Sequence, residues 1–165
     1  MIKSIIRWIV FFILAFILQT TVVPVISIYG IKPDLLVLIL FMLATKTGLI
    51  PAIYTGFFLG LAQDLYSPSI LGQNALSKTV AGSFAGLFNE KVMRIDPFLQ
   101  GVLLLITFLL NDFVYFMVQV VKSGVTMNLL GIELLVTTLP RALFSLLLAV
   151  VPLVLNLYSQ TATKR

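Results

Sequence analysis

Long apolar runs, separated by short polar or proline-containing stretches, organise the whole chain. The runs cover residues 5–23, 34–46, 48–65, 74–89, 98–121 and 133–157. Most approach the roughly 20 apolar residues that a helix needs to cross the hydrocarbon core of a bilayer. The run 34–46 is shorter, so this helix and its neighbour must thin the bilayer or lie partly buried in protein. The pattern predicts an all-α membrane protein, one integral domain over residues 1–165 with six transmembrane helices.

The first run could instead belong to a signal peptide, because Lys3 and Arg7 stand near its start. A signal peptide, however, has an apolar segment of roughly 7–15 residues followed by small residues at a cleavage site. The run 5–23 is longer, and no such site follows it. We therefore expect an uncleaved first helix.

Composition narrows the class of protein. Hydrophobic residues make up 60% of the chain and charged residues 10%, whereas soluble domains average about a quarter charged. The chain contains neither cysteine nor histidine, which excludes a disulfide, a thiolate nucleophile and an imidazole base. These features exclude a soluble enzyme, and we expect no metal or cofactor.

Basic residues predict the orientation of the helices. With both termini in the cytoplasm, the outer side holds only Lys32 and Lys122. The inner side then holds Lys3, Arg7, Lys46, Lys91, Arg94, Lys164 and Arg165. Because cytoplasmic loops of membrane proteins are enriched in lysine and arginine, this asymmetry favours an even number of spans in a plasma membrane. Insertion and anionic lipid also account for the net charge of +5, without nucleic acid.

Two of the predicted helices carry glycines four residues apart. Gly56 and Gly60 lie in one helix, and Gly82 and Gly86 lie in the next. In a bilayer, small residues at this spacing let two helix backbones approach closely. The two helices are therefore predicted to pack against each other.

Charged residues lie at the outer boundary or in the outer half of the predicted spans. Asp112 and Arg141 have similar predicted depths, about 14 and 12 Å at 1.5 Å per residue, and form a candidate ion pair. Lys78 could reach Asp64 or Asp34, and Asp64 is the preferred partner because a short loop joins the two helices. Such charges are costly in a membrane and normally face protein or water. They indicate either an outward-facing polar pocket for a ligand or partner, or a purely structural network.

Motifs for catalysis are absent from the sequence. It has no phosphate-binding G-x-x-x-x-G-K loop and no H-E-x-x-H element. The residues around Asp64 also lack the pattern of an intramembrane aspartyl protease. The sequence therefore predicts a protein that is not an enzyme.

Several short motifs occur together in a recognisable order. K-P-D-L-L at 32–36 is followed by G-x-x-x-G-L-x-Q-D at 56–64, S-P at 67–68, L-G-x-N-A-L at 71–76 and K-T-V-A-G-S-F-A-G at 78–86. This chain resembles the rod shape-determining protein MreD family along essentially its whole length. The part after Asp96 matches in hydropathy and length alone, so Asp112 and Arg141 inherit no role from the family.

The resemblance implies a non-enzymatic inner-membrane component of the bacterial cell-elongation complex. Such proteins bind the single-pass protein MreC, in an assembly with MreB, RodA and a penicillin-binding transpeptidase that organises peptidoglycan synthesis and rod shape. The docking surfaces are expected on exposed apolar helix faces, in the outer loops around Lys32–Asp34 and Tyr66–Asn74, and in the outer polar cluster. That cluster comprises Pro33, Asp34, Gln63, Asp64, Leu71, Gly72, Asn74 and Lys78.

Two other functions remain open. The family's fold resembles that of the substrate-binding subunits of energy-coupling-factor vitamin transporters, and such a subunit is the main alternative. A lipid or small-molecule carrier is a third possibility, although the chain shows no convincing inverted repeat. The Q-D-x-x-S-P and L-G-x-N-A-L stretches favour the shape protein.

Overall fold

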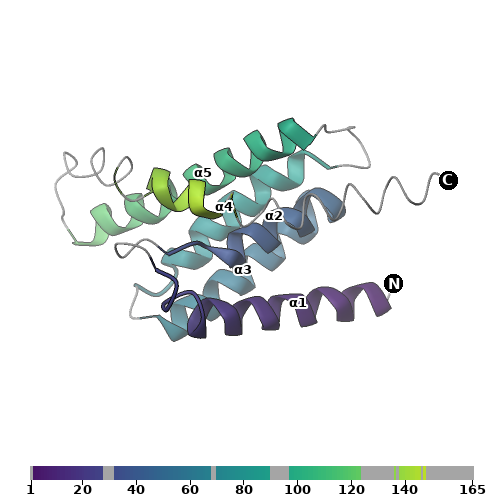
Figure 1. Ribbon diagram of the computed structural model, residues 1–165, viewed down its shortest axis with the longest axis horizontal. Coiled ribbons are helices and arrows are strands. Elements are labelled where there is room, and N and C mark those ends of the chain that lie inside the picture. Colours follow the sequence, from purple (N-terminus) through teal and green to yellow (C-terminus); the bar gives the residue numbers. More distant parts are fainter. Residues whose placement is uncertain are drawn as a thin grey trace.

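Helices joined by short turns make up the computed structural model, which describes residues 2–27, 32–67, 70–89, 97–123, 136, 138–145 and 147 (Figure 1). The helices are α1 (Ile2–Thr21), α2 (Leu35–Thr47), α3 (Leu49–Tyr66), α4 (Gln73–Leu87) and α5 (Pro97–Ser123). A further helical stretch covers 139–145. No strand occurs among these residues, and the all-α class is confirmed.

Local sequence features explain where the helices begin and end. Asp34 caps α2, because its Oδ1 accepts hydrogen bonds from the backbone N–H groups of Leu36 and Val37 at 3.0 and 3.1 Å. Gly48 separates α2 from α3 with a φ of +92°, a conformation that residues with a side chain rarely adopt. One glycine therefore divides the long apolar stretch 34–65 into two helices.

The sixth predicted span falls largely outside the described residues. The structure describes residues 136, 138–145 and 147 of the run 133–157, and Glu133, Lys91, Arg94 and the chain after 147 are outside it. Among the described helices, Phe98–Lys122 is long and apolar enough to cross a membrane, and Trp8–Thr21 and Leu35–Thr47 are shorter apolar helices. The six spans and their orientation therefore stay predictions.

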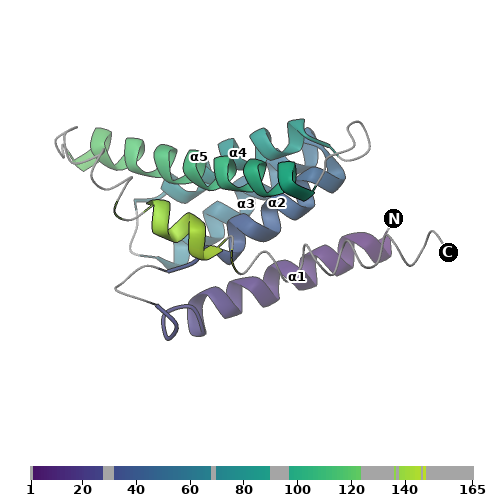
Figure 2. The same ribbon diagram turned by 45° about the horizontal axis from the view of Figure 1, so that its top comes forward.

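α4 lies at the centre of the bundle. It packs most closely against α3 and also contacts α5 and α2, whereas α1 packs along α2 at the edge (Figures 1 and 2). Val37 and Phe41 of α2, Ala85 of α4, and Leu104 and Phe108 of α5 belong to the buried core. α1 exposes many large apolar side chains, as expected for a surface that contacts lipid or a partner.

The four predicted packing glycines lie where α3 and α4 run antiparallel. Each faces backbone of the opposite segment: Gly56 faces Lys78, Gly60 faces Asn74, Gly82 faces Ala52 and Gly86 faces Leu49. A Cβ added to Gly56 would lie 2.5 Å from the Lys78 carbonyl oxygen, and one added to Gly82 would lie 2.9 Å from that of Ala52. Any larger residue would therefore force the two backbones apart.

Candidate functional site

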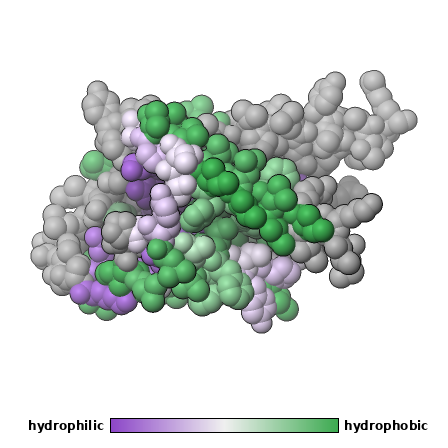
Figure 3. All heavy atoms as spheres, turned by 90° about the horizontal axis from the view of Figure 1, so that it is seen from below, coloured by the Kyte–Doolittle hydropathy of each residue, from purple (hydrophilic) through white to green (hydrophobic). Residues whose placement is uncertain are grey.

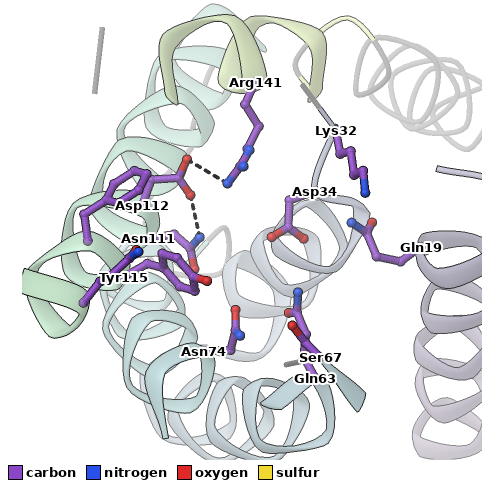
Figure 4. A pocket seen from close by; sticks show the side chains of 12 residues that line it. Gln19, Lys32, Asp34, Gln63, Ser67, Asn74, Asn111, Asp112, Tyr115 and Arg141 are labelled. Carbon is purple, nitrogen blue, oxygen red and sulfur yellow. Dashed lines mark hydrogen bonds and ion pairs between the residues drawn. The ribbon is translucent and has the colours of Figure 1, made fainter. Parts of the chain in front are cut away.

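A polar cavity of ≈360 Å³ lies toward the end of the bundle where α1 and α3 end and α2 and α4 begin (Figure 4). Its lining comprises Gln19, Lys32, Asp34, Gln63, Ser67, Asn74, Asn111, Asp112, Tyr115, Phe116, Gln119 and Arg141. Five predicted site residues thus meet at one cavity: Asp34, Gln63, Asn74, Asp112 and Arg141. Helices α1, α3, α4 and α5 contribute to this lining, together with the segments that directly precede α2 and follow α3.

Asp34 and Lys78 form a buried ion pair at this cavity. Lys78 Nζ lies 3.3 Å from Asp34 Oδ2, and the exposed fractions of the two side chains are 0% and 11%. The Asp34 backbone N–H also donates to Ser145 Oγ at 3.0 Å. The expected pairing of Lys78 with Asp64 is therefore wrong, because Lys78 forms its ion pair with Asp34.

Asp64 instead completes the start of α4. Its carboxylate accepts hydrogen bonds from the backbone N–H groups of Gly72 and Asn74 at 2.9 Å and of Ala75 at 3.1 Å. The Asn74 side-chain amide donates to it as well, at 2.9 Å. Gly72, the N-cap residue of α4, has no side chain that could satisfy these donors. A carboxylate from the end of α3 therefore caps α4 and complements its helix dipole.

The expected partners Asp112 and Arg141 meet across the other wall of the cavity. Arg141 Nη1 lies 3.4 Å from Asp112 Oδ2, and the Asn111 amide donates to Asp112 Oδ1 at 3.0 Å (Figure 4). The Asp112 side chain is 3% exposed and that of Arg141 is 26% exposed. Arg141 is thus the member of this pair that solvent or a ligand in the cavity can reach.

Other predicted residues lie beside the cavity rather than on it. Pro33 is buried at the start of α2, and Gly72 occupies the turn before α4 with a φ of +91°. Leu71, in the same turn, is 62% exposed. The outer polar cluster therefore comprises cavity-lining residues, helix caps, the buried Lys78 and Pro33, and one exposed apolar side chain.

Five lining residues were not among the predicted site residues: Gln19, Asn111, Tyr115, Phe116 and Gln119. Lys32 and Ser67 belong to motifs and loops that the sequence analysis singled out, but no role was predicted for either side chain. Asn111, Tyr115 and Gln119 are four residues apart in α5, so they share one face of that helix. This polar periodicity in an apolar helix was the available signal.

Metal binding receives no support from the described part of the chain, which contains no group of three or more histidine, cysteine, aspartate or glutamate residues arranged to hold an ion. Amides are the most frequent side chains of the lining, which also contains two carboxylates and two cations. Such a lining can form many hydrogen bonds to a polar ligand.

The bundle, with its membrane-length helix and with buried ion pairs around a cavity at one end, has the features of a helical membrane protein with a polar cavity. The chain belongs to the family of rod shape-determining protein MreD, whose model matches residues 1–160. The family resemblance of the sequence motifs is thus confirmed, and the protein is a membrane component of the rod-shape machinery. No curated protein and no solved structure matches this chain.

Proposed function

We propose that this protein is a non-enzymatic, multi-pass component of the bacterial inner membrane that binds MreC directly. Through MreC it acts with MreB, RodA and a penicillin-binding transpeptidase to organise peptidoglycan synthesis during elongation. The observation that carries this proposal is the family match over residues 1–160, nearly the full length of the chain.

The proposed arrangement has six membrane-spanning helices with both termini in the cytoplasm, in a fold similar to that of vitamin-binding subunits of energy-coupling-factor transporters. The asymmetry of lysine and arginine supports it. In this orientation the ends of α1 and α3 lie on the outer side, so the polar cavity faces outward. Figure 3 is consistent with this arrangement, because the strongest hydrophilic colouring gathers at that end of the visible face and hydrophobic residues cover much of the rest.

The turn between α3 and α4 is our proposed docking surface for MreC. Leu65, Tyr66 and Leu71 are 74%, 65% and 62% exposed, and all three lie at or near this turn. Exposed apolar side chains that lie together are typical of interaction sites, because burying them against a partner is favourable. The Asp64 hydrogen bonds to the start of α4 hold this turn in place.

Replacement of Leu71 tests this surface. We expect depletion of the protein to turn rods into spheres, and a wild-type copy to restore them. A Leu71→Ser copy should accumulate normally but restore rods poorly. A Leu87→Ser copy is the matched control, because Leu87 is 61% exposed at the end of α4 that is remote from Leu71. Equal restoration by both variants would reject the docking surface, and unchanged rods after depletion would reject the function.

A vitamin-binding subunit of an energy-coupling-factor transporter is the second candidate. The specific observation in its favour is the polar cavity of ≈360 Å³, which lies within the usual size range of small-molecule sites. Adjacent genes distinguish the two candidates. A neighbouring gene for a protein with one membrane span and an outer coiled coil would support the shape complex, whereas genes for ATP-hydrolysing subunits would support the transporter.

A further inference from the structure

The cavity retains hydrogen-bonding capacity that the protein itself does not use. Gln63 Oε1, Asn111 Oδ1 and Arg141 Nε are buried, and none has a hydrogen-bond partner within the described residues. All three residues line the cavity, and Asn111 is only 3% exposed. A buried polar atom without a partner destabilises the folded protein, so such atoms are rare unless water or a ligand satisfies them. Two acceptors and one cationic donor are therefore available to a ligand.

The charges of the lining leave a cation in excess. Lys78 neutralises Asp34, and Arg141 neutralises Asp112. Lys32 is exposed at the cavity and forms no ion pair with any residue that the structure describes (Figure 4). Both carboxylates already accept hydrogen bonds from the protein. An anionic oxygen is therefore favoured near Lys32 and Arg141.

A separate apolar groove lies along two of the helices that line the polar cavity. It has a volume of ≈470 Å³ and lies between α1 and α3, with Ile9, Phe12 and Ile17 on one side and Phe58 and Ala62 on the other. Ile17 lies two residues before Gln19, and Ala62 directly precedes Gln63, so the same two helices line both sites. From Ile9 to Ile17 the groove follows α1 for about 12 Å at 1.5 Å per residue.

We propose that the cavity and the groove together bind one membrane lipid with an anionic, hydroxyl-bearing headgroup. The phosphate lies near Lys32 and Arg141, and headgroup hydroxyls donate to Asn111 Oδ1 and Gln63 Oε1. An acyl chain occupies the α1–α3 groove. This site goes beyond binding of MreC, and it gives a chemical reason for the unpaired polar atoms, the excess cation and the adjoining apolar groove.

Four related compounds test the three parts of this ligand on the purified full-length protein. Phosphatidylglycerol has the phosphate, two hydroxyls and acyl chains, and phosphatidylmethanol has the same charge without the hydroxyls. Diacylglycerol lacks the phosphate, and glycerol 3-phosphate lacks the chains. Native mass spectrometry from detergent should give phosphatidylglycerol an affinity at least tenfold higher than each of the other three.

Other orders of affinity would overturn the proposal. Equal binding of phosphatidylglycerol and phosphatidylmethanol would mean that the amide oxygens do not recognise hydroxyls. Glycerol 3-phosphate binding as tightly as the lipid would assign the cavity to a soluble phosphorylated compound. Failure of every lipid to bind, with an MreC helix crosslinking into the groove, would assign the groove to the partner protein.

Two variants connect the selectivity to named side chains. Gln63→Met keeps the side-chain length but removes the free acceptor, so it should abolish the preference for phosphatidylglycerol over phosphatidylmethanol. Lys32→Gln should weaken both anionic lipids about equally. Gln100→Met and Lys122→Gln are matched controls outside the cavity and should change neither affinity. Equal losses in the controls would refute the assignment, whereas MreC binding is a separate measurement that this result leaves unaffected.

Discussion

Removal of either member of the Asp34–Lys78 pair should strongly destabilise the bundle. At 3.3 Å, with an effective dielectric constant of about 20, the attraction is about 5 kcal/mol. In soluble proteins, removing one partner of a buried pair costs about 3–5 kcal/mol, because the other charge is left buried. Lys78→Met should therefore cost about 3 kcal/mol. Asp34→Asn leaves the buried lysine unpaired, although asparagine can still cap α2.

The double variant separates the ion pair from the other roles of these residues. Asp34→Asn with Lys78→Met leaves no unpaired charge, so it should be more stable than either single variant. Melting in detergent should fall by roughly 6–12 °C for Lys78→Met if each kcal/mol shifts the midpoint as in soluble domains of this size. Lys122→Met, at an exposed lysine, is the control and should melt like the wild type. Additive losses in the double variant would refute the coupling.

Three further predictions concern packing, capping and topology. Gly60→Leu should lower accumulation and thermal stability, because the α4 backbone lies against Gly60. Gly101→Leu is the control and should lower neither, since open space surrounds Gly101. Equal effects of the two variants would exclude the close contact. Asp64→Asn should speed amide hydrogen exchange at the start of α4 by roughly tenfold or more, because a hydrogen bond to a charged group contributes about 1.5–3 kcal/mol. An unchanged exchange rate would contradict the capping role of Asp64. Cysteine introduced at Ser69 should react with an impermeant reagent and one at Ser4 should not, and the reverse pattern would invert the topology.

The helices of the described region could be predicted well from the sequence, because apolar periodicity and helix-stopping residues act locally. The expected run 34–46 corresponds to α2, and its end is set by Gly48, whose positive φ is a local property. The contact between the glycines of α3 and the backbone of α4 could be predicted equally well, since close backbone contact needs only small residues at the right spacing.

Side-chain partners across the bundle were harder to predict. Proximity in the chain favoured Asp64 as the partner of Lys78, but Asp34, 44 residues away, lies opposite the lysine once α2 packs on α4. The Asp64 carboxylate instead accepts hydrogen bonds from the backbone N–H groups at the start of α4, which have no partner within that helix. Which residues close the cavity depends on how the helices rotate against one another, and hydropathy does not specify that rotation.

Binding of MreC by this protein can be measured by affinity purification of the tagged protein from its own membranes. The proteins that co-purify should be quantified against a preparation that carries the same tag on an unrelated membrane protein. MreC should be enriched, with RodA and MreB present in smaller amounts. Enrichment of an ATP-hydrolysing transporter subunit together with a bound vitamin, and no MreC, would contradict the proposed binding of MreC.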